Sequence, residues 1–249
     1  MTRRRWIADE VSGNRAAITG DHATHLTRVL RARVGQQFDI SAAGVTRLGR
    51  IVNIVGDRVE FELGEEIPGS STSNLTILLS IFKFDRMEWA IEKCTELGVS
   101  RVIPVIARRT DAHLVTASAK RLERWRRIAL EASEQSRRAS PPEISAPFKL
   151  KDALASGSGT RIVLSETEIK VQLHDVLEAD SLYEITLAIG PEGGWTEDEI
   201  RDFHAAGWIS ASLGPTILRA ETAAIAATAI VLSELWSSSQ PSSASPVLS

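Results

Sequence analysis

Ala188-Ile189-Gly190-Pro191-Glu192-Gly193-Gly194-Trp195-Thr196 is a glycine-rich stretch that joins a short apolar run, residues 184–189, to a helical pattern. The apolar run predicts a buried strand. Thr196 and Glu199 form a Thr-x-x-Glu capping box, which predicts that a helix begins there. The glycines between them predict a tight turn at the carboxyl end of a strand, where open α/β sheets bind ligands. Glycine has no Cβ, so backbone groups of such a turn can approach a ligand closely.

A second stretch of the same kind follows, Leu213-Gly214-Pro215-Thr216-Ile217-Leu218-Arg219-Ala220-Glu221-Thr222-Ala223. Neither stretch is a phosphate-binding loop, since no Gly-Lys-Ser/Thr follows, and neither is a Gly-x-Gly-x-x-Gly dinucleotide fingerprint. One such loop alone is typical of an ordinary β–α turn. Two of them, each ending a strand and opening a helix, predict a shared ligand site in which backbone groups bind a purine.

The two stretches, Ile-Gly-Pro-Glu-Gly-Gly and Leu-Gly-Pro-x-Ile-Leu-Arg-x-Glu-Thr-Ala, resemble the loops of SPOUT methyltransferases and, more narrowly, of the RsmE family. That family methylates N3 of a uridine in 16S ribosomal RNA of the small ribosomal subunit. The resemblance extends from Arg4 to about Leu235. It implies an α/β fold in which a small PUA-like β-barrel domain precedes a SPOUT-type trefoil-knotted methyltransferase domain. It also implies a homodimer and S-adenosyl-L-methionine as cofactor. The knot rests on the resemblance alone, because general rules of chain connection disfavour knots.

We predict three regions: an RNA-binding barrel over 1–70, a methyltransferase domain over 74–236 and a disordered tail over 237–249. The first region contains alternating apolar patterns, at 37–40 and 58–63, separated by glycine-containing turns, which is typical of half-buried strands. The tail is rich in serine and contains too little apolar surface to fold by itself.

The composition limits the possible partners and compartments. The formal net charge is −3, so an RNA site must be a local basic patch. Cys94 is the single cysteine, which excludes an intramolecular disulfide and favours a reducing compartment; we predict it to be a core residue. We expect a cytoplasmic protein without membrane or metal partners, because there is no signal peptide, no membrane-length apolar run and no metal-ligand spacing of histidines.

Basic residues cluster in two predicted helices. The first extends from Asp21, as N-cap, to about Arg33, and the second covers residues 120–138 with seven basic and three acidic residues. Such patterns alone are typical of solvated helix faces, but a local positive excess also attracts phosphate, and arginine binds phosphate in a bidentate way. The resemblance implies RNA contacts by Arg4, His25, Arg28, Arg31, Lys83, Lys93, Arg137 and Arg138.

The resemblance also implies a cofactor pocket with three walls. These comprise Leu164, Ser165 and Glu166; then Ile189, Gly190, Pro191, Glu192, Gly193 and Gly194; and then Leu213, Gly214, Ile217 and Leu218. We predict Arg219 as the main catalytic residue. It is always charged and cannot act as a base, but it can donate hydrogen bonds to a uracil carbonyl. Glu192 is the candidate acceptor of the N3 proton and Glu221 an orienting partner, while a purely structural Arg219–Glu221 pair is the alternative.

Two other functions fit parts of the sequence. A non-catalytic RNA-binding assembly factor would need the barrel and the basic helix but not the complete cofactor loops. A related enzyme would instead methylate a ribose 2′-hydroxyl. Nucleoside analysis of the modified RNA distinguishes all three.

Overall fold

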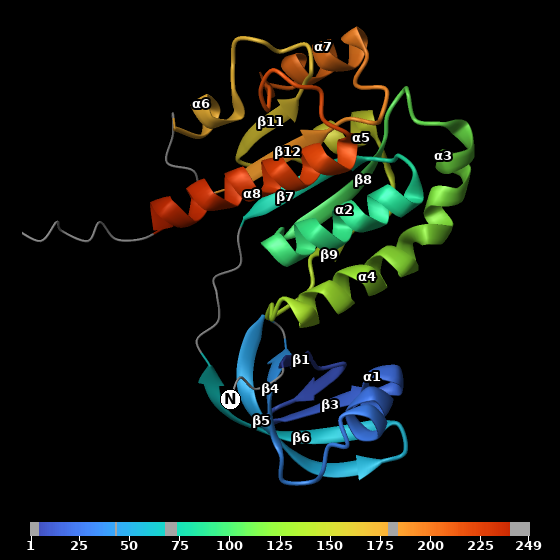
Figure 1. Ribbon diagram of the computed structural model, residues 1–249, viewed down its shortest axis with the longest axis vertical. Coiled ribbons are helices and arrows are strands. Elements are labelled where there is room, and N and C mark those ends of the chain that lie inside the picture. Colours follow the sequence, from blue (N-terminus) through green and yellow to red (C-terminus); the bar gives the residue numbers. More distant parts are fainter. Residues whose placement is uncertain (1–4, 43, 68–73, 179–183, 240–249) are drawn as a thin grey trace, which may run out of the picture. The chain divides into compact units, whose positions relative to one another are not determined.

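The computed structural model describes residues 5–42, 44–67, 74–178 and 184–239 (Figure 1). The chain divides into two compact units. Unit 1 contains Met1–Thr72 and Leu130–Pro141, and unit 2 contains Ser73–Ala129 and Pro142–Ser249. The division falls inside helix α4, Leu122–Gln135, so the last turns of this helix belong to unit 1.

Unit 1 contains a six-stranded sheet in the order β1-β4-β5-β6-β3-β2. Only the β1–β4 pair is parallel, and the other neighbours are antiparallel. The strands predicted at 37–40 and 58–63 are confirmed and lie in β4 and β6. The likeness of this sheet to a PUA barrel stays a prediction. The strand bounds are β1 Arg5–Ile7, β2 Glu10–Ser12, β3 Arg15–Thr19, β4 Gln37–Ala42, β5 Val45–Val55 and β6 Arg58–Ile67.

The helix predicted from Asp21 to Arg33 is shorter than expected. It comprises α1, Gly20–Thr24, and a π-helical turn η1, His25–Val29, in which the N–H of Leu30 donates to the carbonyl of His25 at 3.1 Å. The predicted N-cap is wrong, because Thr19 occupies that position and makes no side-chain cap hydrogen bond. The extra residue in the π turn and the left-handed backbone of Arg31 end the helix early.

Unit 2 is built on a parallel sheet in the order β10-β8-β7-β12-β11-β13, with β9 also paired to β8. Its strands are nearly all apolar because both faces of the sheet are covered, as parallel sheets require. The bounds are β7 Leu75–Ser80, β8 Arg101–Ile106, β9 Glu143–Ile144, β10 Phe148–Lys149, β11 Thr160–Leu164, β12 Ile185–Ile189 and β13 Ile209–Ala211.

Alternate residues of each strand face opposite helical layers. Ile77 and Leu79 pack in a core shared with α2 and α8, which cross one face of the sheet in Figure 1, whereas Leu78 packs with α5 and α7. Cys94 is fully buried in the first core, as predicted, and burial raises the pKa of its thiol to about 12. The helices are α2 Phe84–Leu97, α3 Ala112–Ser118, η2 Ala119–Arg121, α5 Leu150–Leu154, α6 Leu173–Glu178, α7 Glu197–Ala205 and α8 Ala220–Ser239.

The predicted capping box is confirmed at the start of α7. The N–H of Glu199 donates to Oγ1 of Thr196 at 3.2 Å, and the N–H of Thr196 donates to Oε2 of Glu199 at 2.8 Å. Helix α8 extends to Ser239, and the rest of the predicted tail, from 240 on, lies outside the described residues. Among the residues that the structure describes, no helix has the length and apolar character to cross a membrane, and no cluster of side chains could hold a metal ion.

Candidate active site

The predicted loops meet at one edge of the parallel sheet. Strands β12, β11 and β13 are adjacent in that order, so their carboxyl ends point the same way. A loop follows each strand at this end: residues 190–196 follow β12, residues 165–172 follow β11 and residues 212–219 follow β13. Because β11 and β12 are direct neighbours, the predicted wall at 164–166 lies beside the glycine-rich loop. This edge is the usual ligand position in α/β sheets.

The three loops enclose a cavity of about 390 Å³, within the range of small-molecule sites. Every predicted cofactor residue except Gly193 lines it. Both predicted catalytic residues, Arg219 and Glu192, also line it. The lining comprises Arg86, Leu164–Thr167, Ile189–Glu192, Gly194, Trp195, Ala211–Ala220 and Ala223.

The glycine-rich loop is a tight turn that only glycine fits well. Gly194 has φ +68°, and its N–H donates to the carbonyl of Pro191 at 2.8 Å. A Cβ on Gly194 would lie 2.8 Å from Oε1 of Glu166, in the neighbouring loop. The indole N–H of Trp195 donates to the carbonyl of Leu164 at 3.1 Å, which joins this loop to the end of β11. A Cβ on Gly190 would crowd that indole.

Gly193 does not line the cavity, unlike the other predicted residues of its loop. Its carbonyl accepts a hydrogen bond from Nη1 of Arg109 at 2.6 Å, and a Cβ there would lie against the Arg109 side chain. Gly193 therefore contributes to the turn through its contact with Arg109 and not through the cavity wall. Arg109 follows β8 and was not predicted as part of the site; no local pattern marks it.

The other two loops supply apolar and polar walls. In the loop after β13, Gly214 has φ +120°, and Ile217 is 81% exposed although it is apolar. In the loop after β11, the N–H groups of Lys170 and Val171 donate to the carboxylate of Glu168 and lower its pKa. The hydroxyl of Ser165 bonds that of Thr167 at 2.9 Å. An exposed isoleucine at a cavity rim is suited to cover an apolar ring.

Arg86, which the sequence alone did not assign to this site, also lines the cavity. Nη1 of Arg86, in the first turn of α2, donates to Oε1 of Glu192 at 2.5 Å, and Nε lies 3.7 Å from Oε1 of Glu221. Glu221 therefore pairs with Arg86 rather than Arg219, and the Arg219 side chain makes no hydrogen bond or ion pair with any described residue. The alternative in which Arg219 only forms a structural ion pair with Glu221 is therefore not observed. The Lys-x-Asp-Arg run at 83–86 is the sequence motif that could have drawn attention to Arg86.

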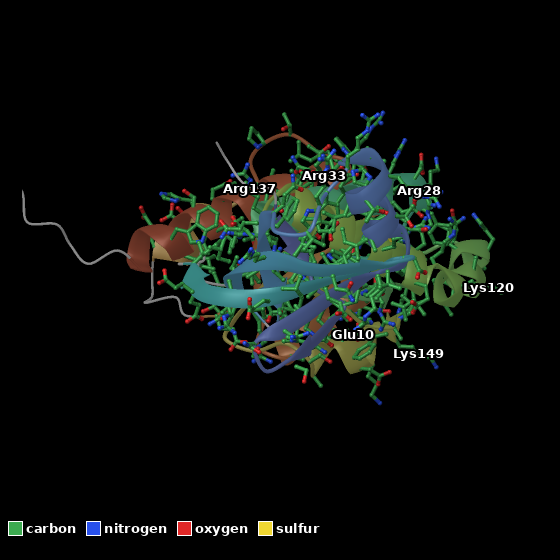
Figure 2. All side chains as sticks on the ribbon, turned by 90° about the horizontal axis from the view of Figure 1, so that it is seen from below. Glu10, Arg28, Arg33, Lys120, Arg137 and Lys149 are labelled. Atoms are coloured by element: carbon green, nitrogen blue, oxygen red, sulfur yellow. The ribbon has the colours of Figure 1, made fainter. Side chains whose placement is uncertain are left out.

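Two predicted RNA residues of unit 1, Arg28 and Arg137, lie on one side of it with Arg33, which was not predicted as a contact. In the view of Figure 2, Arg28, Arg33 and Arg137 project on one side and Glu10 on the opposite side. His25 is exposed and its ring packs on Trp6, with ring centroids 5.7 Å apart. The side with Arg28, Arg33 and Arg137 therefore presents several guanidinium groups to solvent.

Arg31 and Arg137 share an unusual backbone. They have φ +52° and +61°, and they are the only non-glycine residues with positive φ in the described part of the chain. Each follows the last turn of a helix, where glycine is the usual residue. An L-residue there costs about 1–2 kcal/mol. Both side chains are exposed. The arginines are thus placed where local folding would prefer glycine, which suggests a role beyond folding.

The remaining predicted RNA residues differ in availability. Arg4 lies outside the described residues. Burial lowers the pKa of Arg138 to about 10, and Lys93 forms ion pairs with Glu92 and Glu96, which raise its pKa. Lys83 is exposed at the start of α2.

The basic helix is also less positive than its sequence suggests, because carboxylates neutralise part of its charge. Arg121 and Arg124 both contact Oε1 of Glu88, and Arg126 pairs with Glu123. The sequence shows the seven basic residues of this segment but not the partners that α2 supplies. The exposed arginines of unit 1 are therefore the better-placed cations.

The chain is similar to known RNA-modifying enzymes over most of its length. The family model for the RNA methyltransferase domain matches residues 69–232. Ribosomal RNA small subunit methyltransferase E of Rickettsia conorii is 33% identical over 86% of this chain and 88% of its own. The protein of the same name from Mycobacterium bovis is 32% identical over 92% of this chain and 90% of its own. The crystal structure of ribosomal RNA small subunit methyltransferase E from Neisseria gonorrhoeae, bound to S-adenosyl methionine, has 30% identity and a TM-score of 0.82, covering 93% of this chain and 98% of that one.

Proposed function

The chain belongs to the ribosomal RNA small subunit methyltransferase E family of RNA methyltransferases, and from this we propose that it methylates N3 of a uridine in 16S ribosomal RNA, with S-adenosyl-L-methionine as methyl donor. The observation that carries the proposal is the cavity between three strand-end loops, lined by glycines and by Arg219 without a carboxylate partner among the described residues. A non-catalytic RNA-binding protein would have no use for such a cavity. We also propose that the reaction takes place in the cytoplasm. The proposed substrate is either free 16S ribosomal RNA or the small ribosomal subunit that contains it.

The cavity suits the cofactor in size and in lining. Its volume of about 390 Å³ is adequate for a nucleoside-sized ligand. Gly190 and Gly194 leave backbone groups open to close approach, and Ile217 and Leu218 provide an apolar cover. The cofactor supplies a methyl group bound to a positively charged sulfur, so no covalent enzyme intermediate is needed.

The side chains of the cavity have two tasks in this reaction. They must hold uracil N3 in line with the methyl group. They must also stabilise the negative charge that spreads onto the flanking carbonyl oxygens as N3 loses its proton. We assign the second task to Arg219, whose planar guanidinium can donate to a carbonyl oxygen. Glu192 is the proposed acceptor of the proton, directly or through water. A stacked target base would first have to leave its helix, at a cost of a few kcal/mol.

Nucleoside analysis tests the proposed function. Purified protein is incubated with S-adenosyl-L-methionine and either small subunits or 16S ribosomal RNA from cells that lack the gene. We expect 3-methyluridine by mass spectrometry after digestion. A 2′-O-methylated nucleoside would indicate the related enzyme class, and an unmodified digest from both substrates would support the non-catalytic alternative.

We propose that RNA binds the exposed arginines of unit 1. Replacing Arg28 and Arg31 by glutamate should weaken RNA binding without changing cofactor affinity, since neither residue lines the cavity. The slope of log affinity against log salt should decrease by roughly 0.7 for each phosphate that the variant no longer binds. Filter binding at several salt concentrations measures this.

A matched control carries the same change in net charge elsewhere. Lys149 and Lys151 are exposed at the start of α5 in unit 2, and their double replacement by glutamate should leave RNA affinity nearly unchanged. If the Arg28 and Arg31 variant binds RNA as well as this control does, the arginines are not the contact surface.

We further propose a homodimer through α2 and α8 of unit 2. The large apolar side chains Trp89, Ile230 and Trp236 of these helices are exposed, and exposed apolar patches mark association surfaces. Light scattering at micromolar concentration should give about twice the chain mass of 27.1 kDa. Glutamate in place of Trp89 and Ile230 should shift the protein to monomer. A wild-type mass of 27.1 kDa would contradict the proposal.

A further inference from the structure

Arg86 connects the glycine-rich loop to the start of α8, and both lie far from it in the sequence. Its guanidinium lines the cavity from α2. It donates to Glu192 in the glycine-rich loop at 2.5 Å and lies 3.7 Å from Glu221 in the first turn of α8. One cation therefore contacts a carboxylate of the glycine-rich loop and a carboxylate of the helix that follows the loop after β13.

Glu221 has a strong need for this cation. Its side chain is 5% exposed, and its Oε2 has no hydrogen-bond partner among the described residues. A buried carboxylate costs considerable free energy unless a positive group lies beside it. Arg86 is the cation at that place. Arg219 is two residues away in the chain, precedes α8 and is not bound to a described carboxylate.

We propose, on the basis of the proposed function, that Arg86 is a positioning residue that keeps Arg219 available to the substrate. Attraction between charges increases as the dielectric constant falls, so an unpaired Glu221 would attract the nearest remaining cation. Arg219 is the other cation that lines the cavity, and its position in the chain is two residues before Glu221. Arg86 removes this competition. The same guanidinium donates to Glu192, so the spacing between the glycine-rich loop and α8 also depends on it.

A double-mutant cycle tests the proposal. Arg86→Ala should lower turnover by roughly 10²-fold, the size of loss that a misplacement of about 1 Å causes. In a Glu221→Gln background, which has no charge to attract Arg219, the same substitution should cost roughly tenfold less, and the loss that remains is that of the Glu192 contact. Arg86→Gln, which fills more of the vacated space, is measured in parallel in case the alanine variant does not fold. Arg201→Ala is the control, because Arg201 is an exposed arginine paired with Asp198 on α7, outside the cavity; it should keep wild-type turnover.

A crystal structure of the Arg86→Ala protein gives a second measurement that needs no turnover. We expect the Arg219 guanidinium within about 4 Å of the Glu221 carboxylate, the ion-pair distance. Wild-type turnover in Arg86→Ala, or an equal loss in the Glu221→Gln background, would overturn the inference, as would Arg219 remaining in the cavity. A wild-type protein without methyl transfer would instead refute the proposed function, and the crystal structure would still decide the role of Arg86.

Discussion

Arg219→Ala is expected to lower turnover by roughly 10²–10³, the loss measured when one donor to a developing oxyanion is removed. The structure supports this expectation in two ways. Arg219 lines the cavity, and its side chain makes no ion pair or hydrogen bond with the described residues. Its positive charge is therefore not neutralised by a described side chain. The carboxylate that could have neutralised it, Glu221, lies beside Arg86. Single-turnover methylation of RNA measures the effect on the chemical step.

Arg219→Lys separates charge from geometry. Lysine retains the positive charge but lacks the planar fork, so partial activity is expected. Cofactor affinity by calorimetry and the unfolding temperature should both stay close to wild type in the alanine variant. Turnover near the wild-type rate, with fold and cofactor affinity intact, would rule out a catalytic role for Arg219.

Gly194→Val is expected to abolish measurable binding of S-adenosyl-L-methionine. The clash with Glu166 Oε1 alone is not decisive, because that atom ends a flexible side chain that can move. The decisive effect is on the backbone, since φ +68° costs an ordinary L-residue about 1–2 kcal/mol and is a genuine outlier for a β-branched one. The turn would have to open, and the backbone groups that face the cavity would move with it. Calorimetric titration with the cofactor measures the loss.

Gly56→Val provides the matched control. Gly56 has φ +59° in the turn between β5 and β6, and a Cβ there meets no atom within 4 Å. Both substitutions should therefore lower the unfolding temperature through the same backbone strain. Only Gly194→Val should also remove cofactor binding. Equal cofactor affinity in the two variants would show that the glycine-rich loop is not the binding element.

Much of unit 2 could be predicted because its signals are local. A short apolar run followed by glycines marks the end of a buried strand, and the Thr196 capping box marks the helix after it, each within a few residues. The prediction that Cys94 is a core residue is also confirmed. Unit 1 was harder, because the π turn at 25–29 and the left-handed Arg31 depend on how one helix ends, and no propensity rule for arginine anticipates that.

The sequence by itself determined the strand-end loops, most of the residues that line the cavity and, through its motifs, the family. The trefoil knot, the PUA-like barrel and the dimer stay predictions. Only the tertiary structure decided which charges neutralise one another. Arg86 is 106 positions from Glu192, and a salt bridge over that separation leaves no periodic pattern to detect. Parallel strands bring such distant residues to one edge, so the sheet rather than the local sequence selects Arg86 as the partner of Glu221 and leaves Arg219 without a partner among the described residues.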